Sequence, residues 1–156
     1  MRVLTEPLLN AVLTEKLGVR VLAIEILPLR KGDELTIEFV KDDRTRRRGV
    51  LVMTRGVLEI NSIRGSTITL WHDTAPTKVV MVCRNTRSGY LKMYNVWDRG
   101  DIKFQGSGMI KNQVSPTTYE YRCNDRPRDP PLEEFDRFVF RLTVVGDQTD
   151  PIAGIR

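Results

Sequence analysis

The stretch that decides the fold runs from residue 67 to residue 105 and reads TITLWHDTAPTKVVMVCRNTRSGYLKMYNVWDRGDIKFQ. Residues 67–73 alternate between two faces, as expected of a strand with one buried side. Residues 78–84 are largely apolar in succession, which predicts a central strand covered on both faces. Residues 90–97 alternate again, and turn-forming residues separate the three segments. The pattern predicts a three-stranded meander.

Short segments outside this stretch also predict strands, because their side chains repeat with a period of two. We expect 19–27 and 34–40 to pair as a hairpin through Gly32. The remaining strand candidates are 50–53 and 57–60, expected to form a second hairpin, then 102–105, 109–114, 117–124 and 137–145. The alternation places Leu35, Ile37 and Phe39 inside, Tyr119, Tyr121 and Cys123 on one face, and Phe138, Phe140, Leu142 and Val144 inside.

The chain begins with a helical pattern over about 6–17. Thr5 can cap it, Pro7 suits its first turn, and Gly18 ends it. The apolar residues that would share the buried face are Leu9, Val12, Leu13 and Leu17. In the strand that follows, we expect Ile24 and Ile26 on one face and Glu25 on the other.

Many short strands after a single helix predict a mainly β fold: an antiparallel β-sandwich or jelly-roll-like barrel with one N-terminal α-helix. A length of 156 residues suits a single domain over 1–156. Its parts would be the helix, a β core over about 19–145 that includes the proline-rich loop 125–131, and a C-terminal tail over 146–156. Strands do not alternate with helices, which excludes nucleotide-binding folds of the Rossmann type.

Composition favours an ordinary globular protein, with 40% hydrophobic and 29% charged residues. No run reaches the roughly 20 apolar residues of a membrane helix, and polar residues interrupt the first 18, unlike a secretory signal. We therefore expect a cytoplasmic protein with no membrane association. Cys83 and Cys123 have no metal-ligand spacing and are expected to be reduced.

Both tryptophans and the single histidine fall at the ends of the predicted meander strands, beside small polar residues. Such groups recognise sugar faces or protein hot spots, and loops at one end of a β fold commonly carry binding sites. We interpret the chain as a noncatalytic module that binds a protein or a carbohydrate-like ligand. The candidate site comprises Trp71, His72, Asp73, Asn95, Trp97 and Asp98. The alternative is that the tryptophans are core and the polar groups cap turns.

A nucleic-acid interface is the second hypothesis, because the net charge is +5 and the sequence pI is near 9.5. Much of this charge is local: residues 41–48 hold five basic and two acidic side chains. Guanidinium groups suit phosphate by bidentate pairing. The candidate residues are Arg44, Arg46, Arg47, Arg48, Arg84 and Arg87.

A hydrolase using loop carboxylates or His72 is the third hypothesis. Asp73, the neighbour of His72, points to the opposite face of the strand and cannot easily orient the imidazole. Asn95, Asp98 and Asp101 recur every three residues and could offer oxygens to calcium, but three ligands are too few for such a site. The sequence therefore predicts no metal or cofactor.

Overall fold

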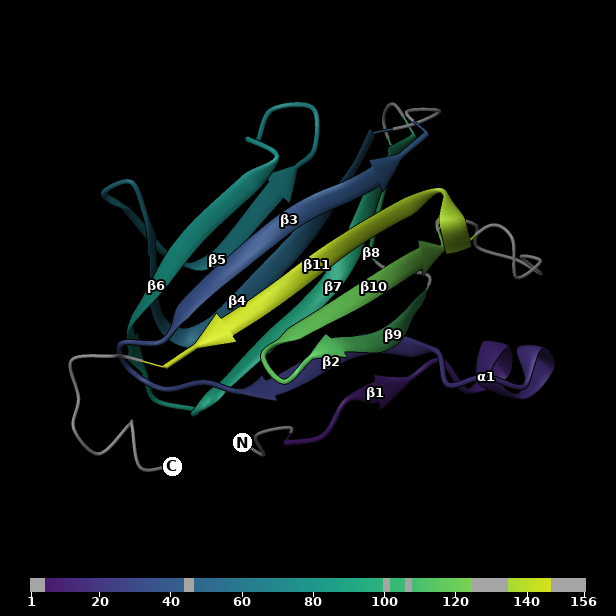
Figure 1. Cartoon of the computed structure of the whole chain (residues 1–156), viewed down its shortest axis with the longest axis horizontal. Coiled ribbons are helices and arrows are strands. Elements are labelled where there is room, and N and C mark those ends of the chain that lie inside the picture. Colours follow the sequence, from purple (N-terminus) through teal and green to yellow (C-terminus); the bar gives the residue numbers. More distant parts are fainter. Residues whose placement is uncertain (1–4, 44–46, 100–101, 106–107, 125–134, 147–156) are drawn as a thin grey trace.

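The computed structural model describes residues 5–43, 47–99, 102–105, 108–124 and 135–146. Within these ranges the chain forms one α-helix and eleven strands (Figure 1). In chain order the elements are β1 (Leu8–Leu9), α1 (Ala11–Leu17), β2 (Leu22–Pro28), β3 (Glu34–Asp42), β4 (Arg47–Ile60), β5 (Ile63–Trp71), β6 (Lys78–Thr86), β7 (Tyr90–Arg99), β8 (Ile102–Gln105), β9 (Gly108–Ser115), β10 (Thr118–Asn124) and β11 (Phe138–Val145).

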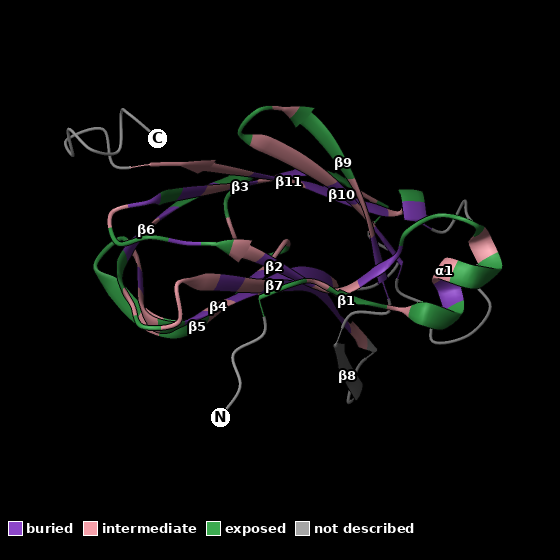
Figure 2. Cartoon of the chain, turned by 90° about the horizontal axis from the view of Figure 1, so that it is seen from below, coloured by how far each residue is buried: buried purple, intermediate pink, exposed green. Residues whose placement is uncertain are grey.

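Eight of the strands close into an antiparallel barrel. Their order around the ring is β2–β9–β10–β11–β3–β6–β4–β7, and β7 pairs back with β2. The three other strands are attached to members of the ring: β1 to β2, β5 to β4 and β8 to β7. Figure 2 shows the barrel flattened, with β3, β11, β10 and β9 in one layer and β2, β7 and β4 in the other. The prediction of a mainly β fold with an N-terminal helix is confirmed, and ring closure defines it as a barrel.

The meander of the sequence analysis is wrong in its pairing. Its three segments are strands β5, β6 and β7, but none of the three pairs with another. Instead β5 forms a hairpin with β4 around Asn61 and Ser62, which both have positive φ angles of 47° and 72°. Paired positive φ angles belong to the tight turns that match strand twist. The local hairpin therefore joins β4 to β5.

β4 is one continuous strand, so the hairpin predicted between 50–53 and 57–60 is also wrong. Its first half pairs with β7 as far as Met53, and its second half pairs with β6 from Gly56 onward. A Cβ atom on Gly56 would lie 2.0 Å from the backbone oxygen of Asn85, so only glycine fits this approach. We call residues 54–56 the β4 crossover, because there the strand changes neighbours.

The hairpin predicted through Gly32 is not formed either. β2 pairs with β1, β7 and β9, whereas β3 pairs with β6 and β11. The segment between β2 and β3 instead lies against β6 and the β6–β7 connection: Leu29 N donates to Gly89 O (2.9 Å), and Gly32 N donates to Cys83 O (2.7 Å). It therefore carries the chain across one end of the barrel.

Apolar side chains fill the interior, where Leu35, Ile37 and Phe39 of β3 meet strands from the opposite layer as predicted. The face of β11 predicted to lie inside is likewise buried or half-buried, and so is the face that Tyr119, Tyr121 and Cys123 share on β10. β6 differs from the prediction. Val79, Met81 and Cys83 are buried, but Val80 is 46% exposed, so only one face of β6 is covered.

Helix α1 is shorter than predicted because residues 8–9 pair with β2 as strand β1. Asn10 caps the helix: its Oδ1 accepts a hydrogen bond from Leu13 N (3.1 Å), and Gly18 ends the helix with a φ of 70°. Leu13 alone is buried in α1, against Val21 and Phe135, whereas Val12 is 73% exposed. Among the described residues, no helix has the length and apolar character to cross a membrane.

Glu25 lies inside the barrel, although the strand pattern put it on the face opposite the apolar residues Ile24 and Ile26. It pairs with Met93 across the β2–β7 ladder, and its side chain is fully buried. Tyr121 Oη donates to Glu25 Oε2 (2.6 Å), and the ammonium of Lys111 lies 2.8 Å from the same atom. Burial, and then the Glu25 carboxylate, raise the pKa of Tyr121 above its usual value. The buried carboxylate is thus paired and hydrogen bonded.

Candidate functional site

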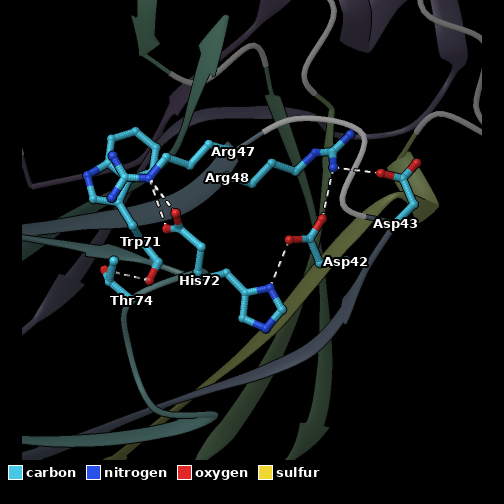
Figure 3. Close-up of polar contacts among 8 residues, drawn as sticks. Asp42, Asp43, Arg47, Arg48, Trp71, His72 and Thr74 are labelled. Atoms are coloured by element: carbon cyan, nitrogen blue, oxygen red, sulfur yellow. Dashed lines mark hydrogen bonds and ion pairs between the residues drawn. The ribbon is translucent and has the colours of Figure 1, made fainter. Parts of the chain in front are cut away.

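One end of the barrel gathers charged and aromatic side chains that are far apart in the sequence (Figure 3). We call it the Asp42 end; it comprises the end of β3, the start of β4, the end of β5 and the start of β11. Backbone hydrogen bonds fix these segments: His72 N donates to Arg48 O (2.9 Å), and Asp43 N donates to Arg137 O (3.0 Å). The fold therefore holds the ends of several strands in one place.

A buried arginine lies on the inner side of the Asp42 end. Arg48 is 2% exposed, and its Nη1 donates to Asp42 Oδ1 (2.8 Å) and Asp43 Oδ1 (2.6 Å). Arg137 Nη1 lies 3.2 Å from the other oxygen of Asp43. A buried charge is tolerated only when it is paired. The carboxylates of Asp42 and Asp43 give Arg48 that pairing.

The single histidine belongs to the same network. Asp42 Oδ2 lies 2.8 Å from Nδ1 of His72, whose side chain is 17% exposed and packs against the ring of Phe39 at 4.9 Å between centroids. A carboxylate at Nδ1 fixes the ring and favours a proton on that nitrogen. Such a pair orients a catalytic base, but within the described residues no serine, threonine or cysteine is hydrogen bonded to the imidazole.

A stacked arginine and tryptophan lie on the outer side of the Asp42 end. Trp71 pairs with Gly49 across the β4–β5 ladder, so no side chain opposes the indole there. The Arg47 guanidinium lies 4.4 Å from the centre of the Trp71 ring, and Arg47 Nε donates to both carboxylate oxygens of Asp73 (2.9 and 3.1 Å). Thr74 Oγ1 donates to Trp71 O (3.4 Å). We call Arg47, Trp71 and Asp73 the Arg47–Trp71 stack.

Five of the six residues of the predicted site divide into two groups. Trp71, His72 and Asp73 do come together at the Asp42 end. Trp97 is 1% exposed, and Asn95 is buried with its Nδ2 donating to Asn124 O (2.9 Å). Both lie inside the barrel, so they belong to no exposed surface.

Asp98 lies outside the barrel, because it pairs with Arg47 across the β4–β7 ladder. Asn95 is inside, three residues earlier on the same strand, so the two side chains project from opposite faces of the sheet. Asp101 lies outside the described residues. The oxygens of Asn95 and Asp98 therefore cannot share one calcium ion.

Most of the described arginines of the nucleic-acid hypothesis are engaged by carboxylates. Arg47 and Arg48 are paired with aspartates on opposite sides of β4, and Arg84 Nη2 lies 2.7 Å from Glu59. Hydrogen bonds from Arg84 and from Arg64 lower the pKa of the Glu59 carboxyl. Arg87 is exposed in the β6–β7 connection, and Arg44 and Arg46 lie outside the described residues. Ion pairing with carboxylates therefore accounts for three of these six arginines.

Sequence reasoning missed the two carboxylates that organise the Asp42 end. In the sequence, Asp42 and Asp43 count only as the two acidic side chains within the basic stretch 41–48, whereas Asp42 is the last residue of β3 and its side chain is 5% exposed. A signal was present: Arg48 alternates in register with the inward residues Val50 and Val52. A buried arginine at that position requires an acidic partner nearby.

Comparisons with protein-family models, with curated proteins and with solved structures each found no match.

Proposed function

We propose that the protein is a noncatalytic β-barrel binding module that binds another protein through the Arg47–Trp71 stack. The observation that carries this proposal is the Arg47 guanidinium 4.4 Å from the centre of the Trp71 ring, held there by Asp73. Tryptophan and arginine are the residue types that most often dominate binding energy at protein interfaces. A side chain that is already held in place loses less rotamer freedom on binding.

The buried network beneath the stack supports the same role. Arg48 adjoins Arg47 in β4, and His72 lies between Trp71 and Asp73 in the chain. Because Asp42 pairs with both Arg48 and His72, the backbone that carries the stack is fixed from inside the barrel. Rigid strand ends favour a preorganised contact surface.

A protein partner is better supported than a carbohydrate-like one. Sugars bind by stacking on an aromatic face, and Arg47 already lies over the Trp71 ring. The combination of a cation, an indole and a carboxylate instead suits a partner surface with its own aromatic and charged side chains. The cytoplasmic location stays a prediction.

The nucleic-acid alternative has weaker support, because an arginine already paired with a carboxylate must give up that contact to bind phosphate. Arg47 and Arg84 are both paired in this way. The hydrolase alternative has support in the Asp42–His72 pair alone, with no nucleophile in contact among the described residues.

Affinity capture with matched variants tests the proposal. Immobilised wild-type protein, Trp71→Ala, Arg47→Ala and the control Thr69→Ala are each exposed to a lysate of the source organism, and retained proteins are quantified by mass spectrometry. Thr69 is exposed and lies two residues before Trp71 in β5. We expect wild type and Thr69→Ala to retain the same proteins in similar amounts. Trp71→Ala and Arg47→Ala should retain at least about tenfold less of each, as expected when a hot-spot residue is removed.

Equal retention by Trp71→Ala and wild type, with both folded, would contradict the proposal. Binding of wild type to a single-stranded oligonucleotide at low salt, weakened by Arg84→Gln and Arg87→Gln, would favour the nucleic-acid alternative instead.

A further inference from the structure

A pocket lies on the outer face of the barrel, beside the β4 crossover. Its volume is about 170 Å³. The described residues that line it are Met53, Thr54, Arg55, Thr67, Ser88, Tyr90 and Lys92. Met53 lies six residues beyond Arg47 in β4, or about 20 Å along an extended strand. The pocket is therefore separate from the Arg47–Trp71 stack.

The barrel topology explains why a pocket forms here. β4 pairs with β7 as far as Met53 and with β6 only from Gly56 onward. The pairing of β4 with β5 also shifts register between Met53 and Leu58. Interruptions of this kind disrupt the strand pairing locally, and they recur next to binding sites.

Hydroxyl groups fix the walls of the pocket. Thr54 Oγ1 donates to Tyr90 O (2.9 Å) and lies 2.8 Å from Thr86 Oγ1, so it connects β4 to both β6 and β7. Thr86 Oγ1 accepts from Gly89 N (3.1 Å), and Ser88 Oγ accepts from Tyr90 N (3.3 Å). These bonds hold the β6–β7 connection against the crossover and make the pocket preformed.

The charged residues that line the pocket are both basic. Arg55 and Lys92 contribute two positive charges, and no carboxylate belongs to its described lining. In the described part of the chain, Lys92 makes no ion pair, whereas Arg84, Arg122 and Arg141 each pair with a carboxylate. Because Lys92 lies in a concave site and makes no ion pair with a described carboxylate, it can attract an anion.

The apolar part of the lining favours a ligand with an aromatic ring. Met53 and Tyr90 supply apolar surface, and small-molecule sites combine such surface with a few polar groups that fix orientation. The volume is below the usual range of roughly 300 to 1,000 Å³ for drug-sized ligands. We propose that this pocket binds a small aromatic anion: one ring lies against Met53 and Tyr90, and its phosphate or carboxylate group is held by Lys92 and Arg55.

Titration with phenyl phosphate, followed by amide NMR shifts at low ionic strength, tests this proposal. Lys92→Gln is compared with Lys78→Gln, which removes the same charge from an exposed position of β6 outside the pocket lining. We expect phenyl phosphate to shift the amides that line the pocket, Lys92→Gln to weaken binding about tenfold, and Lys78→Gln to leave it unchanged within about twofold. Phenol, which lacks the charge, and inorganic phosphate, which lacks the ring, should each bind more weakly than phenyl phosphate.

A second pair of variants adds charge at the pocket. Thr67 lines the pocket, while Thr69 is exposed two residues further along the same face of β5. Thr67→Glu should weaken phenyl phosphate binding more than tenfold, and Thr69→Glu much less. The proposal is overturned if phenyl phosphate does not bind at millimolar concentration, if Lys92→Gln and Lys78→Gln behave alike, or if phenol and phenyl phosphate bind equally. Trp71→Ala should not change this binding, which separates the result from the proposed protein contact.

Discussion

Asp42 Oδ2 lies 2.8 Å from Nδ1 of His72, although the two residues are 30 positions apart in the chain. The other oxygen of Asp42 accepts a hydrogen bond from the buried guanidinium of Arg48. One carboxylate therefore connects the end of β3 to β4 and to the segment after β5. Its loss affects both the barrel end and the surface that we propose as a binding site.

Asp42→Asn should destabilise the fold by about 2–4 kcal/mol, because Arg48 stays buried and loses its charged contact with Asp42, one of the two carboxylates that it pairs with at this end of the barrel. Urea unfolding followed by circular dichroism measures the change. Asp73→Asn is the matched control: it removes the partner of Arg47, but Asp73 is 56% exposed, so a loss below about 1 kcal/mol is expected. Equal losses in the two variants would show that the Asp42 network contributes no more than a surface ion pair.

The strands with one buried face could be predicted from the sequence. β3, β7 and β11 alternate with inward residues such as Leu35, Met93 and Phe140, all of which are buried. The number of covered faces of β6 could not be predicted, because Val80 is exposed on the outer face. Valine is favoured on strands whether or not it is buried, so a run of valines does not reveal how many faces are covered.

Strand pairing could not be predicted from the sequence, because contacts between distant segments close the barrel. Glu25 illustrates the difficulty: neighbouring residues placed it on the outer face, and its partners Tyr121 and Lys111 lie on β10 and β9. The same holds for the candidate site. The closeness of Trp71 and Asp73 could be predicted, because they lie two residues apart. The position of Asp42 near them could not, because it depends on the pairing of β3 with β11 and β6.

The two tryptophans should behave differently in solution. Trp97 is buried at the inner side of the Asp42 end, whereas Trp71 is half-buried on the outside. Acrylamide should therefore quench Trp71 in a Trp97→Phe variant several times more than Trp97 in a Trp71→Phe variant. Trp97→Ala should cost about 3–5 kcal/mol of unfolding free energy, and Trp71→Ala about 1 kcal/mol. Equal quenching of both indoles would contradict this arrangement.

Tyr121→Phe should change how stability depends on pH. Burial and the Glu25 carboxylate raise the pKa of Tyr121 in the folded state, whereas the unfolded chain has a tyrosine pKa of about 10. Above that pH the unfolded state loses a proton that the folded state keeps. The contribution of Tyr121 to the free energy of unfolding is therefore fully present below pH about 10. Above that pH it falls by up to about 1.4 kcal/mol per pH unit.

Urea unfolding of wild type and Tyr121→Phe from pH about 9 to about 11.5 measures this effect, since other titrating groups cancel in the difference. At neutral pH the variant should be about 1–3 kcal/mol less stable, because Glu25 loses a donor inside the barrel. Above pH about 10 the gap should shrink as pH rises. A gap that stays constant over this range would show that Tyr121 titrates normally.

Gly56→Ala should destabilise the β4 crossover, and Gly65→Ala should not. A Cβ atom at position 56 would lie 2.0 Å from Asn85 O and 2.8 Å from Thr86 Cα, both backbone atoms of β6 that cannot move aside alone. At position 65 the nearest atom would lie 3.5 Å away, an ordinary contact. We expect a loss of about 1–3 kcal/mol for Gly56→Ala, measured by urea unfolding, and less than about 0.5 kcal/mol for Gly65→Ala. The substitution should also push β4 away from β6 at the point where β4 changes neighbours. Amide hydrogen exchange should therefore increase more at residues 56–59, which pair with β6, than at residues 49–53, which pair with β5 and β7.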